Sequence, residues 1–244
     1  ISFDWDWGTL SAGKGFMEWG YGEGGKLVLS TKAPSYFYVR LDIEPVSWLS
    51  FNYIHGWLAS DVVDSVRSYR TGSTVGGGNR ILFREKYLAS HTLTLRPLKG
   101  LSIALGESIV YSDRLEPLYL FPLMFYKAAD HYLSKQNNNA GDNAQFFGQI
   151  SSRNHIPNTH LYATLFIDEI RISGLFKSEE ERNQIGFNAG ASVTDLPFEN
   201  LTLTLEYTKV YPFAYNHYIP AQTYENASYT LGHWIGHNGD QFYG

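Results

Sequence analysis

Two histidines near the end of the chain, His233 and His237, stand four residues apart and are followed by Asp240. On a helix this spacing places both imidazoles on one face, where they could bind a metal ion. Three glycines between positions 232 and 239 argue against a helix, because glycine is a poor helix former. We therefore expect a pair of histidines in the interior or at the rim of the fold, with no metal site and no cofactor.

Motifs of covalent catalysis are missing from the sequence. It has neither a Gly-x-Ser-x-Gly nucleophile turn nor a Gly-x-x-x-x-Gly-Lys-Ser/Thr phosphate loop, and the glycines at 76–78 indicate only a loop. The absence of cysteine excludes disulfides and thiolate metal sites. A net charge of -5 argues against nucleic acid as a partner, since phosphate binding needs a basic surface. The sequence predicts a protein that is not an enzyme.

The 18 tyrosines and 6 tryptophans suit two different tasks. An aromatic ring with a polar edge can stack on the C–H surface of a sugar, and it also favours the interface between a bilayer and water. Candidates for sugar binding lie in two segments with little strand character, one of them beside the polar loop that contains Asn138. These candidates are Tyr119, Tyr126, Tyr132, Tyr211, Tyr215, Tyr218 and Tyr224. A place at the membrane interface is the alternative for each of them.

Alternation of apolar and polar residues characterises the elements that must position these side chains. In residues 201–208 every second residue is Leu or Tyr and the others are Thr or Glu; residues 161–168 and 101–111 repeat the pattern less strictly. Only a β-strand has this period of two. We expect roughly 11 strands, near residues 15–22, 26–31, 35–44, 47–58, 80–97, 101–112, 145–152, 159–173, 183–195, 200–211 and 226–236.

The connections between these strands fall into two kinds. Residues 97–100 and 196–200 have the proline, glycine and asparagine of compact hairpin turns. By contrast, residues 61–79 end in a glycine-rich stretch, and residues 115–143 are the least strand-like part of the chain, with a short helix expected at 118–133. Short turns on one side and long loops on the other are the layout of an outer-membrane barrel.

Charged residues stand mainly on the polar side of the predicted strands. Arg40, Asp42, Asp168 and Glu206 alternate with apolar neighbours, so a water-filled or hydrogen-bonded interior would keep them solvated or paired. Glu107 is the exception, because it shares the parity of the leucines and isoleucines of its strand. A bulge at Gly106 would turn it inward.

Periodicity alone leaves two architectures open. The apolar faces could meet lipid in a transmembrane barrel, or they could meet each other in a soluble sandwich or barrel. A mean hydropathy of -0.25 does not decide, because a barrel carries its lipid-facing residues at every second position only. The N-terminal residues lack the features of a signal peptide, and the last residues do not read as a finished strand, so we expect residues 1–244 to be one barrel domain of a longer polypeptide.

Residues 79–240 resemble the Wzi family of capsule-assembly proteins. The resemblance depends on an ordered set of features: Arg80–Arg84 leading into His91–Pro97, Leu105–Tyr111, Pro122-Leu123 with Phe125, Asp142-Asn143, Leu161-Tyr162 with Phe166–Glu169, Leu205–Thr208, Tyr215–His217 and Tyr229–Asp240. Two departures are Phe121, where Asn is expected before Pro122, and the absence of the further strands that a full barrel of this family needs.

The resemblance implies an all-β fold, an antiparallel β-barrel in the bacterial outer membrane that is part of a larger barrel. It also implies association with capsular or surface polysaccharide during capsule assembly or retention, without covalent chemistry. The expected partners are polysaccharide, outer-membrane lipid and other envelope proteins. Two alternatives remain: a structural or partner-binding barrel of a multi-protein outer-membrane complex, and a small-solute porin. The candidate ligand-binding residues are Arg40, Asp42, Glu107, Tyr126, Asn138, Asp168, Glu206, Tyr215, His233 and His237.

Overall fold

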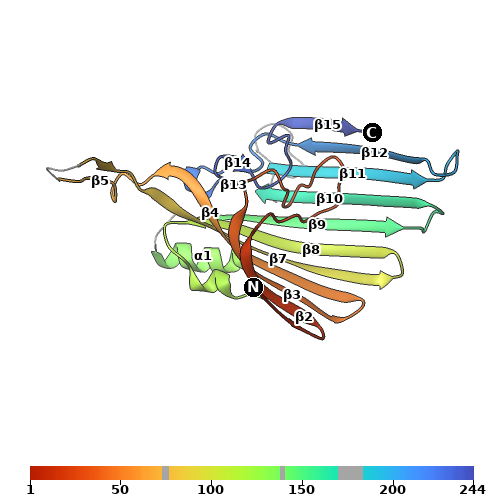
Figure 1. The fold of residues 1–244 in the computed structure, drawn as a ribbon, viewed down its shortest axis with the longest axis horizontal. Helices are drawn as coiled ribbons and strands as arrows, with labels where there is room; N and C mark the ends of the chain where they lie inside the picture. Colours follow the sequence, from red (N-terminus) through yellow and green to blue (C-terminus); the bar gives the residue numbers. More distant parts are fainter. Residues whose placement is uncertain (73–76, 138–140, 170–183) are drawn as a thin grey trace.

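A single curved antiparallel sheet dominates the computed structural model, which describes residues 1–72, 77–137, 141–169 and 184–244 (Figure 1). Its 11 strands follow one another in sequence order, each paired with its neighbour along the chain. They are β1 (Ser2–Trp5), β2 (Gly8–Gly15), β3 (Tyr36–Val46), β4 (Leu49–Val63), β7 (Phe83–Leu98), β8 (Leu101–Ser112), β9 (Asn143–Arg153), β10 (Thr159–Glu169), β11 (Gln184–Thr194), β12 (Thr202–Val210) and β15 (Gly239–Tyr243).

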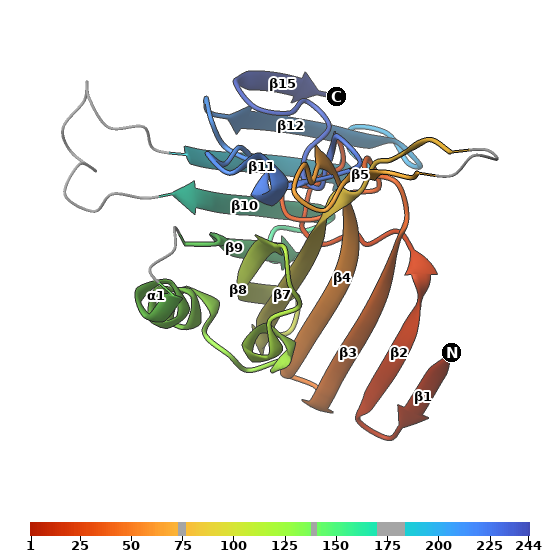
Figure 2. The same ribbon diagram turned by 90° about the vertical axis from the view of Figure 1, so that its left-hand side faces the viewer.

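The expected antiparallel β architecture is confirmed, but a closed barrel is not found. Within the described residues, β1 and β15 are the two edges of the sheet, and each pairs with one neighbour only. Figure 2 shows how strongly the sheet curves between β1–β4 and β9–β15. None of the described helices is long and apolar enough to cross a membrane.

The two ends of the sheet differ as the sequence predicts. At the short-turn end, residues 6–7, 47–48, 99–100, 154–158 and 195–201 join successive strands. At the opposite end, the long-connection end, residues 16–35, 64–82, 113–142 and 211–238 join them. The connection 64–82 carries the small hairpin β5 (Tyr69–Arg70) and β6 (Asn79–Arg80), and 113–142 carries η1 (Pro117–Leu120) and α1 (Tyr126–Asn137).

Four predicted elements, three strands and one helix, differ from the observed ones. Of residues 15–22, only Gly15 belongs to the sheet, as the last residue of β2. Residues 16–22 and 26–31 lie in the connection 16–35, where Trp19 and Leu29 form an isolated bridge. Residues 226–236 hold only the two-residue strands β13 (Glu225–Asn226) and β14 (Tyr229–Thr230), after the short helix η3 (Pro220–Gln222). The helix predicted at 118–133 begins later, at Tyr126.

The two faces of the sheet have opposite character. On one, the apolar face, residues such as Leu93, Ile103, Leu165, Leu203 and Leu205 are exposed. On the other, the polar face, Gln145, Thr164, Asn188, Glu206 and Thr208 are buried. The usual arrangement of a soluble protein is reversed over most of this sheet.

The polar face is buried because the connections 16–35 and 211–238 pack on it. Figure 1 shows residues 16–35 crossing β9–β12. Leu27, Val28, Tyr215 and Tyr224 of these connections form a core with Phe166, which alternates with the polar residues of β10, and with further residues of β3, β4, β7, β8, β9 and β12. A folded layer of protein therefore fills the inside of the curved sheet.

A second, smaller core lies on the apolar face near the long-connection end. There Tyr119, Tyr126 and Ala129 of η1 and α1 pack against Ala89 and Ile109 of the sheet. This helical segment covers only one region of the apolar face. The large aliphatic side chains nearer the short-turn end remain exposed.

Gly106 gives a direct test of the packing on the polar face. An added Cβ would lie 2.2 Å from the ring of Phe147 and 2.5 Å from the carbonyl oxygen of His91. We expect Gly106→Ala to lower the free energy of unfolding by about 1–3 kcal/mol, the usual cost of overpacking. Urea unfolding followed by tryptophan fluorescence measures this. Gly148→Ala is the control, because its Cβ would meet only Leu105 at an ordinary 3.5 Å; equal losses in both variants would contradict the assignment.

Candidate functional site

Glu107 holds the start of α1 on the apolar face. Its Oε2 accepts the backbone N–H of Tyr126 at 2.9 Å and its Oε1 that of Lys127 at 2.6 Å. A carboxylate at a helix N-terminus satisfies unpaired amides and interacts favourably with the helix dipole. The predicted bulge at Gly106 is wrong, because the pairing of β8 with β7 and β9 runs through this residue without a shift. Glu107 stays on the apolar face and is buried by α1 instead.

Asp168 and Glu206 likewise accept backbone N–H groups of long connections, but on the polar face. Asp168 accepts the backbone N–H of Tyr215 at 2.7 Å and the amide of Gln145 at 3.0 Å. Glu206 accepts the backbone N–H of Glu23 at 2.7 Å and the hydroxyl of Tyr162 at 2.7 Å. Both were expected on the polar side of their strands, which is confirmed. Each carboxylate thus binds a backbone amide of a covering connection and a side chain of the sheet.

Arg40 and Asp42 lie together on the polar face of β3. Arg40 Nε is 2.7 Å from Asp42 Oδ2, and the side-chain amide of Asn52 donates to the other oxygen of Asp42. Asp42 and Asn52 line an open cavity of about 680 Å³ at the short-turn end. At least two other strands separate β3 from β8, β10 and β12, which carry Glu107, Asp168 and Glu206.

The two histidines do not form a site together. His233 is completely buried against Gly25, and burial lowers its pKa to about 4, whereas His237 is exposed. Among the described residues, no group of three His, Asp or Glu side chains is placed to hold a metal ion. Tyr126 and Tyr215 are also buried, the latter donating its hydroxyl to the carbonyl of Leu27 at 2.8 Å. Asn138 lies outside the described residues.

The structure instead brings other residues together in what we call the loop-end pocket. This cavity of about 330 Å³ lies where the connections 113–142 and 211–238 meet the ends of β7 and β8, and its volume is within the range of small-ligand sites. It is lined by Arg84, Tyr111, Ser112, Asp113, Arg114, Glu116, Leu133, Ser134, Asp142, Ile219 and Gln222.

Asp142 and Gln222 form the buried part of the pocket. Asp142 accepts the amide of Gln222 at 2.8 Å and the hydroxyl of Tyr119 at 2.9 Å. Burial raises the pKa of Asp142 to about 7; the Tyr119 hydrogen bond opposes this rise, and the neighbouring carboxylates Asp130 and Glu116 add to it. Gln222 is 5% exposed, and its Oε1 has no hydrogen-bond partner in the part of the chain that the structure describes.

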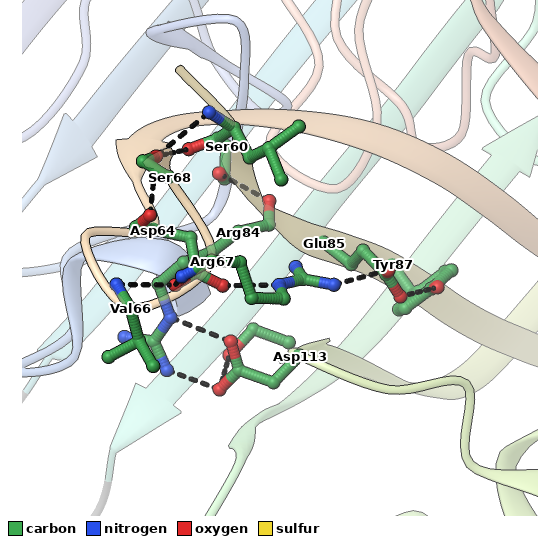
Figure 3. A network of polar contacts seen from close by, with 11 residues as sticks. Ser60, Asp64, Val66, Arg67, Ser68, Arg84, Glu85, Tyr87 and Asp113 are labelled. Carbon is green, nitrogen blue, oxygen red and sulfur yellow. Dashed lines mark hydrogen bonds and ion pairs between the residues drawn. The ribbon is translucent and has the colours of Figure 1, made fainter. Parts of the chain in front are cut away.

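A network of ion pairs fixes the opposite wall of the pocket (Figure 3). Arg84 donates to both carboxylate oxygens of Asp113, through Nε at 2.6 Å and through Nη2. Beside this pair, Arg67 bridges Asp64 and Glu85, and Glu85 accepts the hydroxyl of Tyr87 at 2.7 Å. The network ties the base of the connection 64–82 to the start of the connection 113–142.

Sequence reasoning did not select the residues of the loop-end pocket as a site. Asp142 belongs only to the features of the family resemblance, and Gln222 belongs to no motif of the sequence. They are 80 residues apart in the chain. The one local signal is that Asp113 and Asp142 stand just outside predicted strands, where polar residues are ordinary.

Comparisons with known proteins add no neighbour: no family model, no curated protein and no solved structure matches this chain. The resemblance to the Wzi family and the function it implies therefore stay predictions. The site is argued from its own geometry.

Each buried carboxylate should protect its own amides from hydrogen exchange. Glu107→Gln replaces two charged acceptors by one neutral oxygen, and hydrogen bonds to charged groups contribute about 1.5 kcal/mol or more, so exchange at Tyr126 and Lys127 should become roughly tenfold faster. Glu206→Gln should accelerate exchange at Glu23 and leave Tyr126 and Lys127 unchanged. Mass spectrometry of exchanged peptides measures both; a uniform rise across the chain in either variant would contradict separate roles.

Proposed function

We propose that this chain forms the wall of a bacterial outer-membrane barrel that associates with surface or capsular polysaccharide at its long-connection end. The observation that carries the proposal is the reversed polarity of the sheet, with aliphatic side chains outside and hydrogen-bonded polar side chains inside. Lipid is the environment in which an exposed apolar sheet face is stable, provided that the backbone is paired within the sheet.

The apolar face supports the lipid part of the proposal. Leu105 is 67% exposed and Leu205 74%, and the same surface includes Ile103 on β8, Ile150 on β9 and Leu203 on β12. Contiguous exposed apolar surfaces of this kind mark contact with a membrane or a partner, because monomeric soluble proteins rarely expose them. Charged residues are few on this face, and Glu107 is buried there by α1.

Exposed aromatic residues are placed as an interfacial girdle requires. Trp7, Trp48 and Phe198 are exposed in the turns of the short-turn end. Phe83 and Phe125 are exposed near the long-connection end. Aromatic side chains gather at the two boundaries of a bilayer, where an apolar ring and polar neighbours are both accommodated.

The polysaccharide part of the proposal depends on the loop-end pocket and on the family resemblance. The pocket combines hydrogen-bonding side chains such as Asp142 and Gln222 with the apolar side chains of Leu133 and Ile219. Polar groups in a fixed arrangement beside apolar surface are suited to the hydroxyls and C–H faces of sugars. The loop-end pocket lies at the long-connection end of the sheet.

The two alternatives are less well supported. A small-solute porin needs an open interior, whereas the connections 16–35 and 211–238 pack on the polar face around Phe166 and Tyr224. A partner-binding barrel would use the same apolar face against protein, and the two sheet edges are consistent with it. Co-purification of subunits in stoichiometric amounts would favour that alternative.

Lipid contact predicts that two equally exposed leucines respond differently to arginine. Leu105 lies within β8 and is 67% exposed, while Leu98 at the end of β7 is 61% exposed. In a bilayer, Leu105→Arg should lower the free energy of unfolding by about 2–4 kcal/mol and Leu98→Arg by roughly 0–1 kcal/mol, because arginine is costly only away from the interface. Urea unfolding from phospholipid vesicles measures both. Small and equal effects would mean that the apolar face does not meet lipid.

Polysaccharide association predicts that the detergent-solubilised chain retains cell-free capsular polymer on an affinity column. The retained fraction should be assayed for both carbohydrate and polypeptide, so that polymer binding and partner binding are separated. The control is a column that carries the same chain after it has been unfolded in urea. Recovery of polypeptide without carbohydrate would support the partner-binding alternative, and recovery of neither would contradict both.

A further inference from the structure

We infer that the loop-end pocket selects saccharide units by their hydrogen-bond donors, and so takes neutral or amino sugars in preference to uronic acids. The inference rests on the proposed function, because it specifies which sugars that function would hold. It depends on an imbalance within the pocket: the buried acceptor atoms have capacity for a ligand, while the arginines are paired with carboxylates.

The free acceptor is the side-chain oxygen of Gln222. The orientation of the amide follows from its neighbours, since Nε2 donates to Asp142 Oδ1 at 2.8 Å and lies 3.4 Å from the hydroxyl of Ser112. Oε1 is then left without a partner among the described residues, in a residue that is only 5% exposed. A buried acceptor without a hydrogen bond is costly, so a ligand that brings an O–H or N–H donor to it gains free energy.

Carboxylates next to Gln222 extend this acceptor surface. Asp142 lies against Gln222, and Glu116 lines the same pocket with a largely buried side chain. Each carboxylate oxygen has two lone pairs, and the recorded bonds from Gln222 and Tyr119 take one on each oxygen of Asp142. A hydroxyl or an ammonium group is favoured beside such atoms, and another carboxylate is repelled.

The cationic groups of the pocket are already paired. Arg84 makes a bidentate pair with Asp113, and Arg114 lies 3.5 Å from Glu116. A uronate would have to displace one of these carboxylates to gain a guanidinium partner. Bidentate arginine–carboxylate pairs are the stronger kind, so Arg84 is the less available of the two.

Three sugar hexamers of equal length test the inference on the full chain in detergent micelles: oligomers of glucose, of glucosamine and of galacturonic acid. Isothermal titration should give binding of the glucose and glucosamine hexamers at least about tenfold tighter than binding of the galacturonic acid hexamer, since only the first two bring donors without a carboxylate. Tightest binding of the galacturonic acid hexamer would overturn the inference.

Two substitutions locate the effect. Gln222→Met keeps the length of the side chain and removes the acceptor, so it should weaken binding of the two favoured hexamers about tenfold. Gln241→Met on β15, outside the pocket, is the matched control and should change binding less than twofold. Urea unfolding midpoints establish that each variant is folded. Unchanged binding in a folded Gln222→Met variant would overturn the inference.

Arg114→Gln distinguishes recognition of sugar donors by the acceptor atoms from recognition of a carboxylate by the guanidinium group. Its side chain is 65% exposed, so the substitution leaves the packing intact, and binding of the glucose and glucosamine hexamers should persist. A loss of all binding in this variant would show that the guanidinium is the recognition group and would overturn the inference. If capsular polymer is retained but the hexamer preference is reversed, the inference fails and the proposed function stands. If neither polymer nor any hexamer binds, both fail.

Discussion

Burial of three strand carboxylates is the constraint on which the rest of this fold depends. Glu107, Asp168 and Glu206 each project from the sheet and accept backbone amides of a long connection. A buried carboxylate is tolerated only when hydrogen bonds replace its hydration, and a buried amide needs an acceptor. Each carboxylate and its connection therefore require one another. The positions of α1, of residues 211–238 and of residues 16–35 all follow from these pairings.

The same pairings explain how a sheet with a polar inner face can have a solid interior. Small and polar side chains on the polar face are buried by connections that bring their own apolar residues, such as Leu27 and Tyr224. Backbone carbonyls of these connections are used as well: Asn188 donates to that of Tyr21 at 2.8 Å. Polar strands and apolar connections thus exchange their usual places. The loop-end pocket lies at the margin of this arrangement, where two connections meet above the strand ends.

Eight of the 11 strands of the sheet, β3, β4 and β7 to β12, could be predicted from the sequence, because alternation is a local property; β1, β2 and β15 were not predicted. Residues 159–169 and 202–210 show their period of two directly. Residues 26–31 hold a short apolar run that also predicts a strand, yet Leu27, Val28 and Leu29 pack within the interior and do not join the sheet. The parity of Glu107 is predicted correctly, whereas the bulge at Gly106 is not, because the helix α1 that buries this carboxylate comes from residues 126–137. Gln222 meets Asp142 only through the tertiary fold, and no spacing in the sequence indicates that contact.

Pairing of each strand with its sequence neighbour has a consequence for the order of folding. Hairpins joined by residues 47–48 or 99–100 close short loops, which cost little chain entropy and form early. The contacts of Glu206 with Glu23 and of Asp168 with Tyr215 span 183 and 47 residues. We expect the sheet to assemble first, with its carboxylates still hydrated. Water should leave the interior in a later step, as the connections dock on the polar face. That late step is the one at which a chaperone would have most to protect.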